Sequence, residues 1–286
     1  MNYRHAFHAG NFADVHKHVV LARILLYLRQ KPAAFRVIDS HAGAGRYELA
    51  SDESSRGGEW RDGIARLFEA AARMDGRAND LLAPYLEIVA GYNSSGDLRI
   101  YPGSPLIVQK MLRAQDRLIA CEVDPQAVAA LADVLHGDRR TKALAIDGWT
   151  AIGAYVPPRE RRGLVLIDPP FEDPGDFGRL AESLSGAHRK WPNGVYILWY
   201  PMKTREGPDA LAKRLQRLDI QKILRCEIML RRGREDGALA GSGLILVNPP
   251  FTLEEDLRIL QPALVRTLAP RPEGGSQRID WVVPGR

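Results

Sequence analysis

The sequence predicts an α/β protein with one doubly wound, mostly parallel sheet, and three observations support this prediction. Short apolar runs recur along the 286 residues, several of them end at an acid or at a Gly or Pro turn, and amphipathic segments separate most of them. Hydrophobic residues make up 45% of the chain and charged residues 26%, which allows a sizeable core. We therefore expect a single Rossmann-like domain over residues 1–286.

Seven segments have the composition of buried strands. Helical segments separate most of them, which predicts parallel pairing, whereas the last two follow one another directly and predict a hairpin. The expected strands are residues 35–39, 117–122, 142–146, 163–167, 194–200, 220–230 and 243–247.

Helical periodicity accounts for most of the connections. In the first helix Val15, Val19, Ala22 and Leu26 recur at helical spacing, and Asp14 is the expected cap. Further helices are expected at 105–114, capped by Ser104, and at 125–136, 176–190 and 207–218.

Residues 51–100 interrupt the alternation of strands and helices. The segment 51–63 is polar and rich in glycine, whereas 64–74 and 81–92 have amphipathic periodicity. We expect a small helical insertion at about 51–100, and a surface location for the Pro-, Gly- and Arg-rich tail after Pro270.

Composition indicates a cytoplasmic protein. No apolar run approaches the ~20 residues needed to span a bilayer, and the N-terminus lacks the apolar region of a secretory signal. Cys121 and Cys226 lie in apolar strand-like segments and are expected to be buried thiols.

The net charge of +5 and the pI near 9.3 permit binding to a polyanion. Arginine dominates the basic residues, which suits contacts with phosphates and bases. A GC-rich genome that prefers arginine codons would give the same composition, so both explanations stay open.

The strand 163–167 ends in Asp168-Pro169-Pro170-Phe171. Ligands of open α/β sheets bind at the carboxyl ends of strands. Prolines lack an N–H and hold the preceding residues extended, which leaves carbonyl oxygens such as that of Pro169 as acceptors. Together with the Asp168 carboxylate and the flat Phe171 ring, they suit the amino group of a stacked base. The alternative is a plain turn after a strand.

Further acids and glycines follow the other expected strands. After the first strand, Ser40 to Gly45 form a Gly-rich turn in which Gly43 allows close approach of a cofactor. Glu122 ends the second strand and is placed to hold ribose hydroxyls, and Asp147 with Gly148 follows the third. Asp147 can accept a hydrogen bond from an adenine amino group, or it can belong to a plain turn.

Asn248-Pro249-Pro250-Phe251 fits the same loop pattern after the last expected strand. Asp168 follows the fourth strand and Asn248 the seventh, and in the methyltransferases that this loop pattern resembles the catalytic loop follows the fourth strand, which assigns the reaction to Asp168. Asn248 is expected to shape the pocket wall or the substrate face.

Four histidines near the N-terminus, at positions 5, 8, 16 and 18, raise the question of a metal site. No Cys or Glu joins them at ligand spacing, so we expect no metal.

The pattern Asp/Asn-Pro-Pro-aromatic resembles the signature loop of amino-group methyltransferases that use S-adenosylmethionine. The segments 3–18, 39–47 and 101–105, followed by the two Pro-Pro loops, resemble the RlmJ family, which methylates N6 of an adenine in bacterial 23S ribosomal RNA. The resemblance covers nearly the whole chain. Many relatives carry Tyr where this chain has Phe171, and both rings can stack.

The resemblance implies a seven-stranded methyltransferase fold, S-adenosylmethionine as cofactor, and a monomer acting on 23S ribosomal RNA that is protein-free or early in assembly. Asp168 would be the catalytic residue. Tyr3 and Lys17 would lie near the target base, together with Pro169 and Phe171 of the loop. The cofactor pocket would comprise His18, His41, Gly43, Ser104, Glu122, Asp147, Gly148 and Asp168.

Other classes of protein stay open on sequence alone. A nicotinamide-dependent oxidoreductase would use the same sheet but explains neither the Asp168 loop nor the incomplete glycine fingerprint. A noncatalytic RNA-binding protein leaves the acids at the strand ends without a purpose. Among methyltransferases, DNA adenine and protein glutamine are the nearest alternative substrates, because the loop recognises an amino or amide group.

Overall fold

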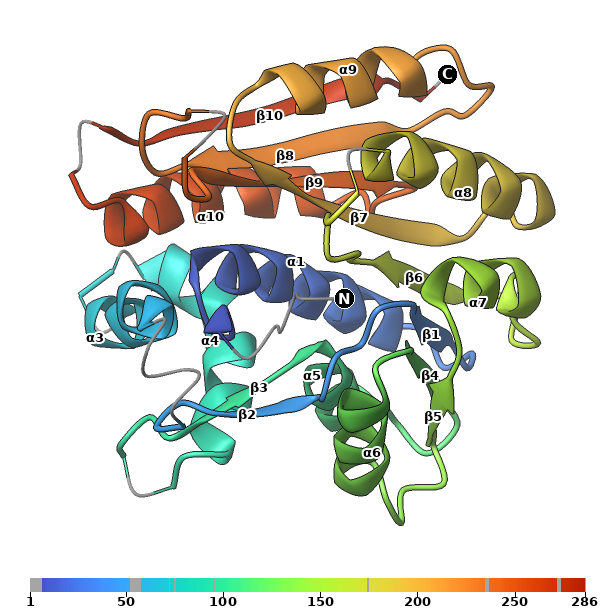
Figure 1. Ribbon diagram of the computed structural model, residues 1–286, viewed down its shortest axis with the longest axis horizontal. Coiled ribbons are helices and arrows are strands. Elements are labelled where there is room, and N and C mark those ends of the chain that lie inside the picture. Colours follow the sequence, from blue (N-terminus) through green and yellow to red (C-terminus); the bar gives the residue numbers. More distant parts are fainter. Residues whose placement is uncertain are drawn as a thin grey trace.

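The computed structural model describes residues 7–51, 58–71, 73–74, 76–94, 96–173, 175–234, 237–271 and 274–285. Across these ranges one eight-stranded sheet has the order β10–β8–β9–β7–β6–β1–β4–β5 (Figure 1). Its strands are β1 (Arg36–Asp39), β4 (Arg117–Glu122), β5 (Thr141–Ala145), β6 (Gly163–Ile167), β7 (Val195–Met202), β8 (Ile223–Met229), β9 (Gly241–Val247) and β10 (Ser276–Val283).

The predicted α/β architecture is confirmed, and the sheet has a clear switch point. β1 pairs in parallel with both β4 and β6, and β5 and β7 extend the parallel sheet on the two sides. Chain order therefore runs outward in opposite directions from the boundary between β1 and β6. Ligands of such sheets bind at this boundary, beyond the carboxyl ends of the strands.

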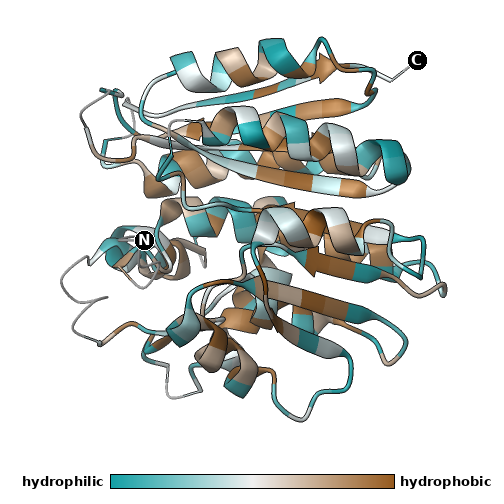
Figure 2. Ribbon diagram, turned by 45° about the vertical axis from the view of Figure 1, so that its right-hand side comes forward, coloured by the Kyte–Doolittle hydropathy of each residue, from teal (hydrophilic) through white to brown (hydrophobic). Residues whose placement is uncertain are grey.

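Side chains alternate between the two faces of the sheet, and helices cover both. In β6, Leu164 and Leu166 pack into one apolar cluster, whereas Val165 and Ile167 pack into the other. The hydrophobic strands between the helix layers are visible in Figure 2. The first face is covered by α1 (Phe12–Arg29), α5 (Ser104–Met111), α6 (Pro125–Val134) and α10 (Leu253–Leu268), and the second by α7 (Gly148–Tyr155), α8 (Asp176–Lys190) and α9 (Glu206–Leu215).

A helical segment lies between β1 and β4. It comprises a π-helical turn, η2 (Arg61–Ala65), and the helices α3 (Arg66–Ala71) and α4 (Gly76–Gly91). A separate antiparallel ribbon of β2 (Arg46–Glu48) and β3 (Ile100–Pro102), which the sequence analysis did not predict, flanks this segment. With three residues in each strand, the ribbon is too short to leave a periodic signal in the sequence.

The prediction of seven strands was wrong, because the tail after Pro270, which lies at the surface as predicted, forms an eighth strand. β10 pairs antiparallel with β8 and forms the edge of the sheet. Its residues are mostly half-exposed, so its sequence lacks the apolar run that predicts a buried strand. Polar side chains contribute to its contact with β8. Arg225 of β8, which is buried, donates to both carboxylate oxygens of Asp280 at 2.9 and 2.8 Å.

Two helix caps also differ from the predictions. Asn11, and not Asp14, caps α1, because the Asn11 side chain accepts hydrogen bonds from the N–H groups of Ala13 and Asp14. The helix therefore begins at Phe12. Likewise Gly103, in extended conformation, is the cap of α5, and Ser104 is the first residue of that helix. Asp14 and Ser104 are thereby available for other contacts.

The predicted hairpin of β8 and β9 is confirmed, and both cysteines are buried as expected. Within the described ranges, no helix combines the length and apolar character required to cross a membrane.

Candidate active site

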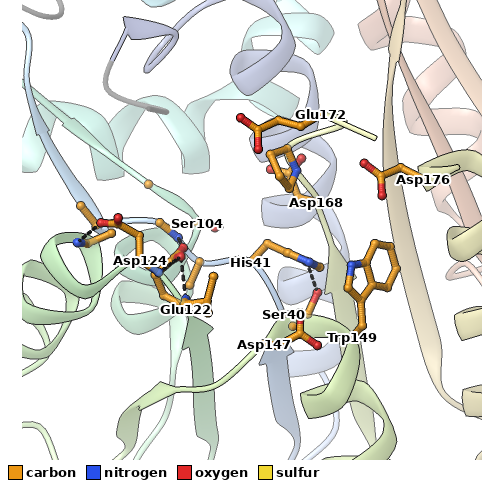
Figure 3. A pocket seen from close by; sticks show the side chains of 18 of the residues that line it. Ser40, His41, Ser104, Glu122, Asp124, Asp147, Trp149, Asp168, Glu172 and Asp176 are labelled. Carbon is orange, nitrogen blue, oxygen red and sulfur yellow. Dashed lines mark hydrogen bonds between the residues drawn. The ribbon is translucent and has the colours of Figure 1, made fainter. Parts of the chain in front are cut away.

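The structure brings the predicted acids and glycines together around one cavity of about 770 Å³ at the carboxyl ends of β1, β4, β5 and β6 (Figure 3). This volume lies in the range of small-molecule and cofactor sites. Lys17 lines this cavity. So do all the residues predicted to bind the cofactor, which are His18, His41, Gly43, Ser104, Glu122, Asp147, Gly148 and Asp168.

Glu122 ends β4 and is oriented by the backbone around it. One carboxylate oxygen accepts the N–H of Gly43 at 2.8 Å, and the other accepts those of Val123 at 2.7 Å and Asp124 at 3.0 Å. A carboxylate has about four lone-pair sites, so at least one remains for a hydroxyl. Glu122 therefore also joins the Gly-rich turn after β1 to β4.

His41 follows β1 and is held in one tautomer. The Ser40 hydroxyl donates to the Leu166 carbonyl at 2.9 Å, so it can only accept from Nδ1 of His41, which lies 2.8 Å away. Nε2 is thus an acceptor. Burial lowers the pKa of His41 to about 4. The negative charge of Asp147 opposes this decrease in part, and the positive charge of Arg179 adds to it. The ring stands edge-on to Trp149 at 5.1 Å.

Asp147 caps α7 by accepting the N–H and the hydroxyl of Thr150 at 2.8 and 2.9 Å through the same oxygen, Oδ2. Gly148 directly follows it and packs against the turn after β1. A Cβ on Gly148 would lie 2.2 Å from the Ser40 carbonyl and 2.7 Å from the His41 ring. Glycine is required here because the two loops approach so closely.

His18 is buried on α1 and hydrogen-bonded through Nδ1 to the Tyr101 hydroxyl at 2.7 Å. Tyr101 in turn contacts the Tyr85 hydroxyl at 3.0 Å, so β3 and α4 hold the histidine in place. Neither partner could be found from the sequence, because each lies more than 60 residues away.

Lys17 joins α1 to the loop after β6. Its buried ammonium donates to Asp14 at 2.9 Å and also to Asp168. Burial by itself would lower the pKa of Lys17, but the two carboxylates outweigh it and raise the pKa above its usual value. Lys17 therefore stays charged and holds Asp168 at the cavity wall.

The loop 168–171 does not present all its residues to the cavity. Asp168 and Pro170 line it, whereas Pro169 and Phe171 are not among the described lining residues. The Phe171 ring lies 5.0 Å from Phe177 and 5.7 Å from Trp199, beside the cavity. Phe171 has a φ of 52°, a conformation that is unusual for a bulky residue and is found at functional loops. Tyr3 lies outside the described residues.

The expectation that Asn248 shapes the pocket or the substrate face was wrong. β9 runs antiparallel to β7, so its carboxyl end lies at the edge of the sheet opposite the cavity. The Asn248 amide donates to the carbonyls of Pro192 and Gly194 at 2.7 and 2.8 Å. Its role is to fasten the start of β7.

Asp39, at the end of β1, was not among the predicted site residues. It is fully buried, and within the described residues neither of its oxygens makes a hydrogen bond of ordinary geometry. Burial raises the pKa of Asp39 to about 7, with Asp168 and Glu122 adding to this effect and Ser104 and Lys17 opposing it.

Asp39 is therefore expected to make stability depend on pH. A raised pKa means that the folded state binds the proton more tightly, so the stabilisation is complete below pH 3.8 and is lost as pH rises through about 7. Relative to Asp39→Asn, the wild type should lose up to about 4 kcal/mol of unfolding free energy between pH 4 and 8. Denaturant unfolding without cofactor at several pH values measures this difference, and parallel curves for the two proteins would contradict it.

Comparison with known proteins identifies the family. The family model described as "Ribosomal RNA large subunit methyltransferase D, RlmJ" matches residues 32–283. The chain belongs to the RlmJ family. The ribosomal RNA large subunit methyltransferase J of Haemophilus influenzae is 37% identical over 286 residues, and that of Escherichia coli is 38% identical over 284, each covering 99% of both chains.

A solved relative supports the same fold. The crystal structure of protein LPL1258 from Legionella pneumophila superposes with a TM-score of 0.87 at 29% identity, covering 96% of this chain and 98% of that one. As an RlmJ family member, the chain is a methyltransferase, and its methyl donor is S-adenosylmethionine.

The side chains around the cavity fit this cofactor. Its ribose hydroxyls and adenine amino group are donors, and Glu122, Asp147 and Nε2 of His41 are acceptors on the cavity wall. Its methionine carboxylate is an acceptor, and the Lys17 ammonium, which donates to Asp14 and Asp168, has a third N–H left to donate to it. Within the described ranges, no three His, Cys, Asp or Glu side chains group together as metal ligands.

Proposed function

We propose that the protein methylates the N6 amino group of an adenine in 23S ribosomal RNA. The observation that carries the proposal is Asp168, which follows β6 in the sequence Asp-Pro-Pro-Phe and lies on the cofactor cavity, held by Lys17. Membership of the RlmJ family supports the ribosomal RNA substrate, since two relatives are named as methyltransferases of the large ribosomal subunit RNA.

When bound, S-adenosylmethionine supplies a methyl group activated by its sulfonium. The Asp168 carboxylate and the Pro169 carbonyl accept hydrogen bonds from the adenine amino group, which favours a nitrogen lone pair directed at the methyl carbon. Glu122, Asp147 and His41 would hold the cofactor, which would supply the methyl group to this nitrogen while its sulfur leaves as a neutral thioether, and Asp168 or water would take the amino proton. Catalysis is then mostly positioning and electrostatics.

The remaining residues position the base. A flipped adenine would stack on the Phe171 ring, which contacts Phe177 and Trp199. Lys17 keeps Asp168 in one orientation, and Tyr3, which lies outside the described residues, belongs to the proposed base site. The proposal includes a monomer that acts in the cytoplasm on RNA that is protein-free or early in assembly.

We further propose that residues 1–286 form one methyltransferase domain, with the N-terminal motif at 1–18 and the helical segment at about 51–100 as additions to it. The position of η2, α3 and α4 between β1 and β4 supports this division.

Glu122→Ala is expected to weaken S-adenosylmethionine binding about 10- to 100-fold, because it removes a charged acceptor and releases the Gly43 turn. Isothermal titration calorimetry measures the affinity. Asp133→Ala, which removes an exposed acid on α6, is the matched control and should bind as the wild type does. An unchanged affinity in Glu122→Ala would remove this residue from the cofactor site.

The substrate class is tested by transfer of labelled methyl from S-adenosylmethionine to three acceptors: unmodified 23S RNA, adenine-containing DNA, and a protein extract. We expect label in the RNA alone. Label in DNA or protein with none in RNA would show that the loop recognises an amino or amide group of another polymer.

A further inference from the structure

The connection between β8 and β9 projects from the same edge of the sheet as the active site. Met202 at the carboxyl end of β7 pairs with Gly241, the first residue of β9, and Gly241 also pairs with Met229, the last residue of β8. β7 is parallel to β6, so the described parts of this connection, residues 230–234 and 237–240, emerge beside the end of β6 that carries Asp168. β8, β9, β7 and β6 follow one another in this order across the sheet (Figure 1).

This connection packs closely on the residue after β7. The N–H of Ala240 donates to the Met202 carbonyl at 3.0 Å, and a Cβ on Gly233 would lie 1.9 Å from the Lys203 carbonyl. Only glycine permits that approach. The contact brings Arg231, Arg232 and Lys203 onto one rim of the sheet.

Four basic side chains on this rim are exposed: Lys203, Arg231, Arg232 and Arg234, here named the cationic ledge. Within the described ranges none of the four forms an ion pair, whereas many other arginines at the surface do, as Arg77 does with Glu255 and Arg214 with Glu182. Glu235 and Asp236 follow in the sequence, outside the described residues, so segment 231–236 carries one net positive charge and Lys203 adds another. Arg231 donates to the Leu239 carbonyl at 3.1 and 2.6 Å. An exposed cationic rim with no ion pair among the described residues suits phosphates.

The cationic ledge adjoins the base site on two sides. Trp199 of β7 contacts the Phe171 ring, and the Lys17 ammonium lies 5.9 Å from the centre of the Trp199 ring. Trp199 precedes Lys203 by four residues, which is about 13 Å along a strand. On the other side Arg231 lies near Glu59, which accepts hydrogen bonds from His8 at 3.0 Å and Asn11 at 2.9 Å. Asn11 caps the helix that carries Lys17.

We propose that the cationic ledge binds the phosphates of RNA nucleotides next to the target adenine. This proposal rests on the proposed function. Phosphate contacts fix position and register but carry no sequence information, so the ledge orients the strand while the loop 168–171 receives the base.

The test compares Arg231→Gln/Arg232→Gln/Arg234→Gln with a matched control, Arg139→Gln/Lys142→Gln/Arg159→Gln. The control also removes three exposed cations, at the amino ends of β5 and β6 on the opposite edge of the sheet. Binding of an unmodified 23S RNA fragment is measured by fluorescence anisotropy over a range of salt concentrations, and methyl transfer and cofactor affinity are measured in parallel.

The ledge variant should bind RNA about 10-fold or more weakly, and its plot of log affinity against log salt should be shallower by about 2, at about 0.7 per lost phosphate contact. Methyl transfer at saturating RNA and cofactor affinity should stay within about 2-fold of the wild type, and the control should match the wild type throughout. An unchanged salt slope in the ledge variant, or an equal loss in the control, would overturn the ledge while leaving the proposed function intact. A wild type that binds and methylates no RNA would overturn both.

Discussion

Replacing Asp168 with alanine is expected to lower the rate of methyl transfer about 10³-fold while changing RNA affinity by less than about 3-fold. The carboxylate is proposed to contact the reacting amino group, so its loss falls on the transition state, where one preorganised polar contact contributes 10²–10³ in rate. The fold should survive, because Lys17 keeps its bond to Asp14. Single-turnover transfer of labelled methyl measures the rate, and anisotropy measures RNA binding.

Asn248→Ala is the matched control for this experiment. It changes the first residue of the second loop with the same sequence pattern, which lies at the opposite edge of the sheet and fastens β7. We expect this variant to lose some stability and to keep its rate at permissive temperature. If Asp168→Ala lost RNA binding and rate in equal measure, Asp168 would be a binding residue and its role in the reaction would be wrong.

Replacing Lys17 with methionine is expected to lower the unfolding free energy by about 3–5 kcal/mol. The ammonium is buried between Asp14 and Asp168, and replacing it with an apolar side chain removes a positive charge bonded to the buried Asp14 carboxylate. Breaking a buried ion pair from one side costs this much because the remaining charge stays desolvated. Denaturant unfolding followed by circular dichroism gives the value.

The double variant Asp14→Asn/Lys17→Met separates lost charge pairing from lost packing. Asparagine still offers an oxygen to the Gly10 N–H but has no charge to leave unpaired. It should therefore recover about half of the lost stability. A loss below about 1 kcal/mol in Lys17→Met alone would show that this cation does not hold α1 to the loop after β6.

The sequence was sufficient to predict the strands that build the cavity. β1, β4, β5 and β6 are apolar runs followed by polar loops, and in a parallel sheet all such ends meet at one edge. Glu122, Asp147 and Asp168 could therefore be grouped without coordinates. His18, His41 and Ser104 were implied only by resemblance, because their residue types and spacing do not point to a cofactor.

Other features depend on contacts that no local pattern reveals. The spacing of Asp14 and Lys17 on one helix is readable, but the bond from Lys17 to Asp168 spans 151 residues. Asp39 acquires its raised pKa from burial, which becomes visible only in the folded protein.

The position of Asn248 could have been corrected from the sequence. The helical segment between β7 and β8 is a crossover that makes β8 parallel to β7, and the predicted β8–β9 hairpin turns β9 antiparallel to both. This direction of β9 decides at which edge of the sheet the loop that begins with Asn248 lies. β9 pairs antiparallel with β7, so the loop at its carboxyl end lies away from the cavity.

The central claim, that Asp168 directs methyl transfer to an adenine amino group, is tested most directly by nucleoside mass spectrometry of 23S RNA after reaction with S-adenosylmethionine. The RNA must come from cells that lack the modification. We predict N6-methyladenosine with the wild type and its loss with Asp168→Ala. Methylation at a ring carbon, at the ribose or on another base, or N6-methyladenosine that persists in Asp168→Ala, would contradict the account.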